Sequence, residues 1–226
     1  TKGHVKDFGI FGNFGYKFSE NAVLSLYSRS DDHNVTGRNE TYKINLEKII
    51  NKLKFGLTHS TGLRNPTLYE FYGTDNYGIK GNTDLNPEKS KTNEMSGEYK
   101  ITDSMSFKMT AYRTKIFDQI ETNAGYTKHE NELINLNQEG LESKFIYKNN
   151  NKNFSVFSNF SKSEKINGQT QNRRPEINFG SNYIQSFKNS FIGPFNFNIS
   201  YRYTGKYNDW TGNKNEFVKS TDLVDF

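Results

Sequence analysis

The sequence predicts an all-β protein, and more narrowly a segment of an antiparallel transmembrane β-barrel. Apolar and polar residues alternate along most of the chain, as in strands with one apolar and one polar face. The alternating stretches number about eleven and run for roughly 9 to 12 residues, whereas globular strands average about 5 to 6. A ten-residue strand tilted by about 45° rises roughly 23 Å, which matches the apolar band of an outer-membrane barrel. A soluble β-sandwich also alternates and stays open as the alternative on pattern alone.

The strands are predicted in order along the chain. Alternation is clearest at residues 53–60 and 195–204, where every second residue is Leu, Phe, Ile, Tyr or His. Further alternating stretches lie at residues 8–18, 22–30, 42–46, 95–101, 105–111 and 177–183. Residues 220–226 read as the beginning of a strand with nothing to pair with, so we expect the chain to be an internal piece of a longer protein.

The connections between these strands alternate strictly in length. Short connections are predicted near residues 19–21, 49–51, 102–103 and 149–151, with a moderate one at 185–194. Longer polar connections are predicted at residues 31–40, 63–90, 118–130, 162–173 and 205–219. This rhythm is typical of a meander whose short periplasmic turns lie at one end and whose long extracellular loops lie at the other.

Aromatic and charged residues indicate where the membrane would lie. Aromatic residues beside short connections are Phe18, Tyr99, Tyr147 and Phe195, and those towards long ones are Tyr27, Tyr42, Tyr112, Tyr203, Tyr207 and Trp210. We expect two girdles, one at each membrane interface. The charged faces of residues 43–47 and 94–100 would cost roughly 2 to 4 kcal/mol per cation at the bilayer midplane, so we expect them to face a wet or protein-filled lumen.

Composition excludes several other classes of protein. The mean hydropathy of −0.89 is low, yet 15% of the 226 residues are aromatic, which is not typical of a disordered chain. No apolar run approaches the roughly 18 to 20 residues of a transmembrane helix. The absence of Cys excludes disulfides, thiol chemistry and Cys-type zinc sites. The net charge of +5 is spread without a Lys/Arg block, so no nucleic-acid partner is expected.

The sequence contains no recognisable catalytic or metal-binding constellation. The four His residues have no metal-ligand spacing, and His59 continues an apolar face, where a structural His is expected. Carboxylates are plentiful, but no nucleophile, base and acid can be grouped from their spacing. We therefore expect no enzyme, no bound metal and no cofactor.

Two ordered segments carry a family resemblance. Residues 62–73 contain Arg64, Pro66 and Glu70, and residues 81–90 read Gly-Asn-Thr-Asp-Leu-Asn-Pro-Glu-Lys-Ser, followed by Glu94. Together they resemble the barrel signature of TonB-dependent outer-membrane receptors. Matches that follow in the family's order are Asn135 with Gly140-Leu141-Glu142, Arg174-Pro175, Tyr203-x-Gly205 with Asp209, and Thr221 to Asp225. The chain looks closest to the cobalamin and siderophore branches.

The resemblance implies a 22-stranded barrel in the outer membrane of a Gram-negative bacterium. The family barrel surrounds an N-terminal plug, and TonB drives transport by pulling on that plug. Residues 1–226 would be a partial barrel domain that lacks the plug and the terminal strands. The implied partners are outer-membrane lipid, the protein's own plug, TonB through the plug, and a small metal-chelate substrate.

The implied function is energised uptake of a scarce metal chelate, with cobalamin, a ferric siderophore and haem left open. A passive porin-like channel and a soluble β-sandwich binding module stay open as alternatives. We expect ten motif residues at the lumen or its rim: Arg64, Pro66, Glu70, Asn82, Pro87, Glu88, Glu94, Gly140, Glu142 and Arg174. The alternative is that these residues are ordinary structure of the barrel wall. We expect four aromatic residues of the long loops to contact the substrate: Tyr72, Tyr77, Tyr126 and Trp210. The alternative is that these rings pack in a girdle or within the loops.

Overall fold

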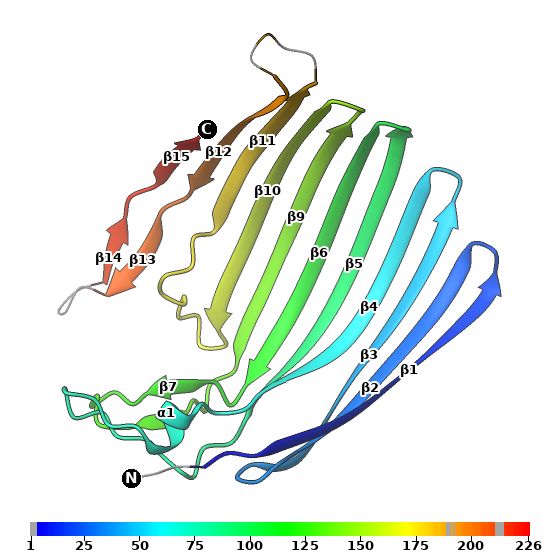
Figure 1. Cartoon of the computed structure of the whole chain (residues 1–226). Coiled ribbons are helices and arrows are strands. Elements are labelled where there is room, and N and C mark those ends of the chain that lie inside the picture. Colours follow the sequence, from blue (N-terminus) through cyan, green and yellow to red (C-terminus); the bar gives the residue numbers. More distant parts are fainter. Residues whose placement is uncertain (1–3, 189–190, 192, 211–214) are drawn as a thin grey trace.

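The chain forms one curved antiparallel sheet of eleven strands (Figure 1). The computed structural model describes residues 4–188, 191, 193–210 and 215–226. Each strand pairs with its neighbours in chain order, and the strands are β1 (Asp7–Ser19), β2 (Ala22–His33), β3 (Gly37–Ile50), β4 (Leu53–Arg64), β5 (Glu88–Thr102), β6 (Met105–Phe117), β9 (Leu136–Lys148), β10 (Lys152–Lys165), β11 (Ile177–Phe187), β12 (Phe195–Thr204) and β15 (Thr221–Asp225). The predicted all-β meander of about eleven strands is confirmed. In the described part of the chain the sheet does not close, and β1 and β15 lie at its edges.

Ten of these strands span 10 to 15 residues, so most exceed the predicted length. The predicted long loop at residues 31–40 is wrong, because β2 and β3 continue until His33 pairs with Gly37. Its polar residues extend the ladder, since Asp31 is buried against Arg29 and His33 is buried under the helix described below. The last strand is also corrected: β15 pairs with β12, from Thr204 opposite Thr221 to Ser200 opposite Asp225.

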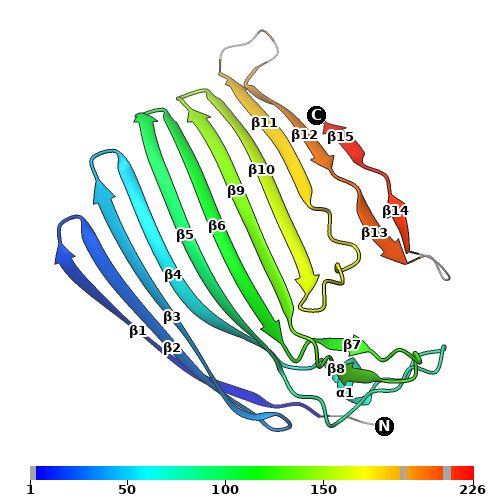
Figure 2. The same cartoon turned by 180° about the vertical axis from the view of Figure 1, so that it is seen from behind.

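The short connections lie together at one end of the sheet, as predicted. They join β1 to β2, β3 to β4, β5 to β6, β9 to β10 and β11 to β12, and both views show them along the same edge (Figures 1 and 2). Beside the short turn at residues 34–36 between β2 and β3, the opposite end carries the larger connections. These contain helix α1 (Leu68–Tyr72) and two small antiparallel pairs, β7 (Ile120–Thr122) with β8 (His129–Asn131) and β13 (Tyr207–Trp210) with β14 (Asn215–Val218).

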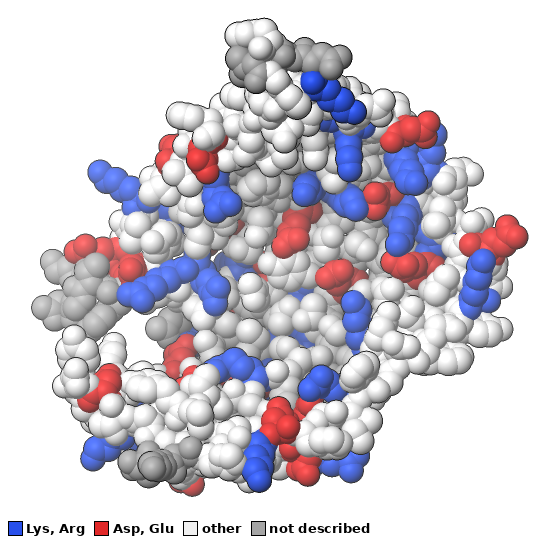
Figure 3. All heavy atoms as spheres, viewed as in Figure 1, with Lys and Arg blue, Asp and Glu red and all other residues white. Residues whose placement is uncertain are grey.

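The cross-strand register divides the sheet into a polar and an apolar face. Residues directly opposite one another point to the same side, and side chains alternate along each strand. The hollow face seen in Figure 3 carries charged side chains across its middle, including the ion pairs of Lys54 with Glu47 and of Lys108 with Glu98. The other face carries a continuous apolar row on β4 to β11, formed by Leu57, Met95, Ala111, Leu141, Phe160 and Ile177.

This division corrects part of the predicted girdles. Tyr99 and Tyr42 lie on the apolar, convex face, near the turn end and the loop end respectively. Tyr27 lies opposite Lys43, and Tyr112 lies opposite Gly140, so both occupy the polar, concave face and are not girdle residues. The reason is the period of two along a strand, because a shift of one position moves a side chain to the other side of the sheet.

The described residues bury little apolar surface, as expected for a single curved sheet. One small core lies at the loop end, where Phe71, Leu85 and Ile120 are buried together with Val35 and Tyr72 packed against them. Many large apolar side chains elsewhere are exposed on the convex face, for example Met95 at 52%. Among the described residues, no helix is long and apolar enough to cross a membrane.

Candidate functional site

Helix α1 sits in the long connection between β4 and β5 and is started by a capping box. The hydroxyl of Thr67 accepts a hydrogen bond from the N–H of Glu70, and the Glu70 carboxylate accepts one from the N–H of Thr67 at 2.7 Å. This reciprocal arrangement satisfies two N–H groups that a helix start leaves without partners. Pro66, directly before the cap, is buried. The sequence between Pro66 and Gly73 therefore fixes where the helix begins, and its position brings the Glu70 carboxylate back towards the end of β4.

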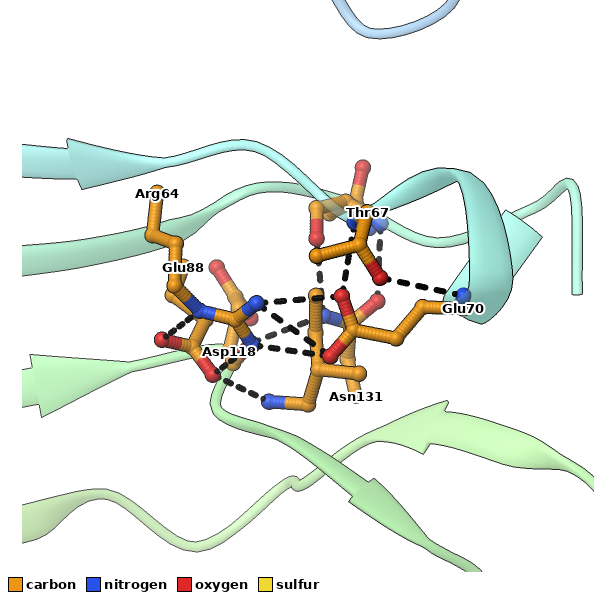
Figure 4. Close-up of polar contacts among 8 residues, drawn as sticks. Arg64, Thr67, Glu70, Glu88, Asp118 and Asn131 are labelled. Atoms are coloured by element: carbon orange, nitrogen blue, oxygen red, sulfur yellow. Dashed lines mark hydrogen bonds and ion pairs between the residues drawn. The ribbon is translucent and has the colours of Figure 1, made fainter. Parts of the chain in front are cut away.

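Arg64, the last residue of β4, is the centre of an ion-pair network at the concave rim (Figure 4). Its Nε and Nη2 donate to the two carboxylate oxygens of Glu88 at 2.7 and 2.6 Å, which is a bidentate pair. Its Nη1 and Nη2 also donate to Glu70 at 3.0 to 3.2 Å. The Glu70 and Glu88 side chains are 15% and 17% exposed, so one guanidinium is the shared counter-charge of two largely buried carboxylates. This network fastens α1 to β4 and β5.

The network reaches a second connection through Glu88. The N–H of Ile120, which begins β7, donates to Glu88 Oε1 at 2.8 Å. Asn131, at the end of β8, accepts from the N–H of Asn86 and donates through Nδ2 to the carbonyls of Asn86 and Asp118. Residues 65–87 and 118–135 therefore form one hydrogen-bonded unit, which we call the loop cluster.

Close backbone approaches hold the two halves of the loop cluster together. The N–H of Lys80 donates to the carbonyl of Thr127 at 2.8 Å, and Nδ2 of Asn82 donates to the carbonyl of His129 at 3.0 Å. Gly81 lies against the backbone of α1, where an added Cβ would come within 2.5 Å of the Phe71 carbonyl carbon. The motif glycine at position 81 is therefore required by the approach of two backbones, a fact that spacing alone does not reveal.

The pKa of Glu70 lies below its ordinary value. Burial by itself raises the pKa of this carboxyl, but the hydrogen bonds from Arg64 and Thr67 outweigh that effect and favour the charged form. The ionised carboxylate is therefore part of the folded arrangement of the loop cluster.

The other motif residues lie either on the concave face of the sheet or in connections near the loop cluster. Gly140 lies under the Tyr112 ring, and an added Cβ would come within 2.6 Å of its Oη, so only Gly fits there without a shift. Glu94, on β5, lies directly opposite Tyr112. Glu142, on β9, lies opposite Thr110 and on the same face as Tyr112. Pro87 is buried just before β5, and Arg174 is exposed and lines a separate hollow beside β13 and β14. The structure thus places Pro66, Glu70, Asn82 and Pro87 in the loop cluster, and Arg64 and Glu88 at the strand ends that bond to it. Glu94, Gly140, Glu142 and Arg174 lie outside it.

The four predicted loop aromatics have different surroundings. Tyr77 and Tyr126 are 92% and 54% exposed at the tips of the two connections in the loop cluster. Tyr72 packs against the buried core beside Phe71, at a ring distance of 5.7 Å, and contributes to packing. The backbone of Trp210 ends β13, and its side chain lies outside the described part of the structure.

Sequence reasoning missed the residues that join the two connections. Asn131, at the end of β8, bonds Asn86 in the other connection and Asp118 in its own. Lys165 ends β10 and ties the second connection to that strand, because its Nζ pairs with Glu121 at 3.1 Å and Glu132 at 3.4 Å. Their partners are 13 to 45 residues away, at sites that only the folded loops bring together. Asp118, which follows the end of β6, has a left-handed φ of 55°, a conformation that Asp adopts more readily than most residues.

The whole chain matches one family model. Residues 1–226 match the model described as "TonB dependent receptor-like, beta-barrel". The chain belongs to this family. Members of the TonB-dependent receptor family are outer-membrane proteins of Gram-negative bacteria, and they are receptors and transporters, not enzymes.

Solved structures of TonB-dependent receptors share the fold. The siderophore receptor PirA from Acinetobacter baumannii matches with a TM-score of 0.78 at 15% identity, over 97% of this chain and 38% of that one. The FrpB iron transporter from Neisseria meningitidis (F3-3 variant) matches with a TM-score of 0.73 at 14% identity, over 97% and 37%. The copper transporter OprC matches with a TM-score of 0.74 at 12% identity, over 97% and 38%. The chain therefore spans less than two fifths of the length of each of these receptors.

Proposed function

We propose that this chain is a partial barrel domain of an outer-membrane receptor that takes up a small metal chelate with energy from TonB. The observation that supports this most directly is the loop cluster, in which two connections are joined over the concave rim and present the exposed rings of Tyr77 and Tyr126. In this proposal the plug and the other barrel strands belong to the complete receptor, and TonB acts through the plug.

The substrate we propose is a ferric siderophore. PirA is named as a siderophore receptor, and another structure of the same fold, at 17% identity and a TM-score of 0.77, is the ferric enterobactin receptor PfeA. Flat aromatic rings with polar edges are suited to a chelate with an aromatic periphery. Haem and cobalamin share that flatness, and OprC is named as a copper transporter, so these ligands are the comparison arms of the test.

The binding test uses the complete receptor purified in detergent, with ferric enterobactin as the probe and haem, cyanocobalamin and Cu²⁺ as alternatives. Each aromatic contact contributes about 0.5 to 1.5 kcal/mol, so Tyr77→Ala with Tyr126→Ala should weaken ferric enterobactin binding about tenfold. Tyr99→Ala is the control, because it removes a ring at the opposite, turn end of β5 whose exposure of 48% is close to the 54% of Tyr126. Equal binding by the double variant and the wild type would remove the loop tips from the proposed site.

A separate test addresses energy coupling. Cells that express the receptor should accumulate radioactive iron from the chelate only when TonB is present, whereas binding at the cell surface should persist without it. Uptake at the same rate in cells lacking TonB would instead support the passive channel. The third alternative, a soluble sandwich, does not fit the family to which the chain belongs.

A further inference from the structure

The short turns at one end of the sheet carry an excess of positive charge. Each of the short-turn hairpins that the structure describes completely has a lysine in or near its turn, at the tip or on the concave side of the sheet. We call these four residues the rim lysines, and they are Lys17, Lys52, Lys100 and Lys148. Two further lysines lie near the same turns on the convex face, Lys48 and Lys152. The same turns contain two carboxylates, Glu20 and Asp103.

The rim lysines have no carboxylate partner within the described part of the chain. Lys54, a neighbouring cation in the β3–β4 hairpin, pairs with Glu47 at 2.9 Å, whereas Lys52 donates to the carbonyl of Ile101 at 3.1 Å. All four rim lysines are exposed, and none of them forms an ion pair with a described residue. Exposed charges of one sign that have no partner attract a molecule of the opposite sign. The turn end is therefore suited to an anionic partner.

The rim lysines form a row along the edge of the sheet. One belongs to each of four neighbouring hairpins, β1–β2, β3–β4, β5–β6 and β9–β10 (Figure 1). A hairpin is two strands wide and neighbouring strands lie about 4.8 Å apart, so the rim lysines recur on average roughly every 10 Å across the strands. A linear polymer with one anionic group in each repeat of comparable length can contact the whole row.

A polar hollow lies between two of these turns. It has a volume of about 640 Å³, and its lining comes from the β5–β6 and β9–β10 turns: Asp103, Ser104, Lys148, Asn149, Asn150 and Asn151. The side chain of Asn149 holds its own turn, since its Oδ1 accepts from the N–H groups of Asn151 and Lys152. The side-chain amides of Asn150 and Asn151 are exposed and form no hydrogen bond with a described residue. Amides beside an ammonium group suit a ligand that carries hydroxyl, acetamido and carboxylate groups.

We propose that the turn end binds the carboxylated amino-sugar polymer of the cell wall. The carboxylates of the polymer contact the rim lysines, and one sugar unit lies in the hollow beside Lys148. The short turns of an outer-membrane barrel face the periplasm, which is the compartment that holds this polymer. The inference rests on the family to which the chain belongs and not on the identity of the transported metal chelate.

The position of the rim lysines favours this polymer over a phospholipid of the inner leaflet. Lipid headgroups surround the convex face, where they reach Lys48 and Lys152. They leave the rim lysines and the hollow without a partner, because these lie at the tips of the turns or on the concave side. A compact acidic protein would contact one or two hairpins, whereas a linear polymer with a carboxylate in each repeat extends along the whole row.

The test measures co-sedimentation of the complete receptor in detergent with purified, insoluble cell-wall sacculi. The variant is Lys52→Gln with Lys148→Gln, and the matched control is Lys48→Gln with Lys152→Gln, which removes two exposed convex lysines from the same two hairpins. An exposed ion pair contributes up to about fivefold in affinity, so the variant should bind roughly tenfold more weakly. The control should bind as the wild type does. Sacculi whose carboxylates have been converted to amides should bind the wild type about as weakly as untreated sacculi bind the variant.

A second measurement uses the unaltered receptor. A soluble glycan fragment of the same polymer should protect Lys52 and Lys148 from chemical acetylation, and should leave Lys48 and Lys152 as reactive as before. Equal co-sedimentation of variant and wild type, an equal loss in the control, or full binding to amidated sacculi would each overturn the proposal. Rim lysines that resist acetylation without any glycan would also overturn it, because another part of the receptor would then cover them.

Discussion

Replacement of Arg64 by Ala tests whether the ion-pair network holds the loop cluster in place. The substitution removes the bidentate pair with Glu88 and the contacts with Glu70, and leaves two largely buried carboxylates without a counter-charge. Breaking a buried pair costs about 3 to 5 kcal/mol, but the Arg64 side chain is 42% exposed, so solvent screening reduces the loss to about 2 kcal/mol. We expect this loss in the local stability of the loop cluster, because the strands keep their own hydrogen-bonded ladders.

Hydrogen–deuterium exchange on the complete receptor measures this loss directly. A local loss of about 2 kcal/mol corresponds to roughly 30-fold faster exchange at the N–H groups of Thr67 and Ile120, which donate to Glu70 and Glu88. Exchange in the middle of β10 should not change. Arg38→Ala is the control, because Arg38 pairs with Glu40 at 3.2 Å and both side chains are about 70% exposed, a pair worth at most about 1 kcal/mol.

Either of two results would refute this prediction. If Arg64→Ala and Arg38→Ala leave the exchange of Ile120 equally slow, the network does not hold the loop cluster. Faster exchange throughout β10 would likewise show that Arg64 stabilises the whole sheet and not this unit.

Three further predictions follow from the same geometry. Gly140→Ala forces a Cβ within 2.6 Å of Tyr112 Oη, so the free energy of unfolding in urea should fall by about 1 to 3 kcal/mol, with Tyr112→Ala restoring part of the loss. Because the pKa of Glu70 is lowered in the folded state, the ionised carboxylate stabilises the loop cluster fully at neutral pH, and this stabilisation is lost as pH falls through the lowered pKa. Hydrogen exchange of the loop cluster should therefore accelerate in acid in the wild type. It should depend less on pH in Glu70→Gln. Asn131→Ala removes both of its hydrogen bonds with Asn86 across the connections and a third one with Asp118, so exchange at the Asn86 N–H should rise at least tenfold while β5 stays protected. Unchanged exchange would mean that the backbone contacts suffice.

The sheet could be predicted from the sequence because the alternation that marks each strand lies within that strand's own residues. Alternation with a period of two and short polar turns define strands without knowledge of their partners, and that is why residues 195–204 coincide with β12. The prediction of a loop at residues 31–40 is wrong because polar residues extend β2 and β3 there. Asp31 and His33 look like loop residues, yet contacts with Arg29 and α1 keep them in the ladder. The girdle prediction is wrong for Tyr27 and Tyr112, because position along a strand does not tell on which face a side chain lies.

The loop cluster could be predicted only in part. Arg64, Glu70 and Glu88 are grouped by motif, but their joint contact depends on the capping box that turns α1 back towards β4. The link from Glu88 to Ile120 joins residues 32 positions apart, and no periodicity encodes it.

Joining the two connections has a consequence for the energetics of recognition. Flexible loops that close separately over a ligand each lose conformational entropy on binding, and this loss lowers the affinity. Here residues 65–87 and 118–135 are already bonded to each other by Asn131, Lys80 and Asn82, so most of that entropy is lost during folding. If the substrate binds at Tyr77 and Tyr126 as proposed, it needs to order only the tips of the two connections.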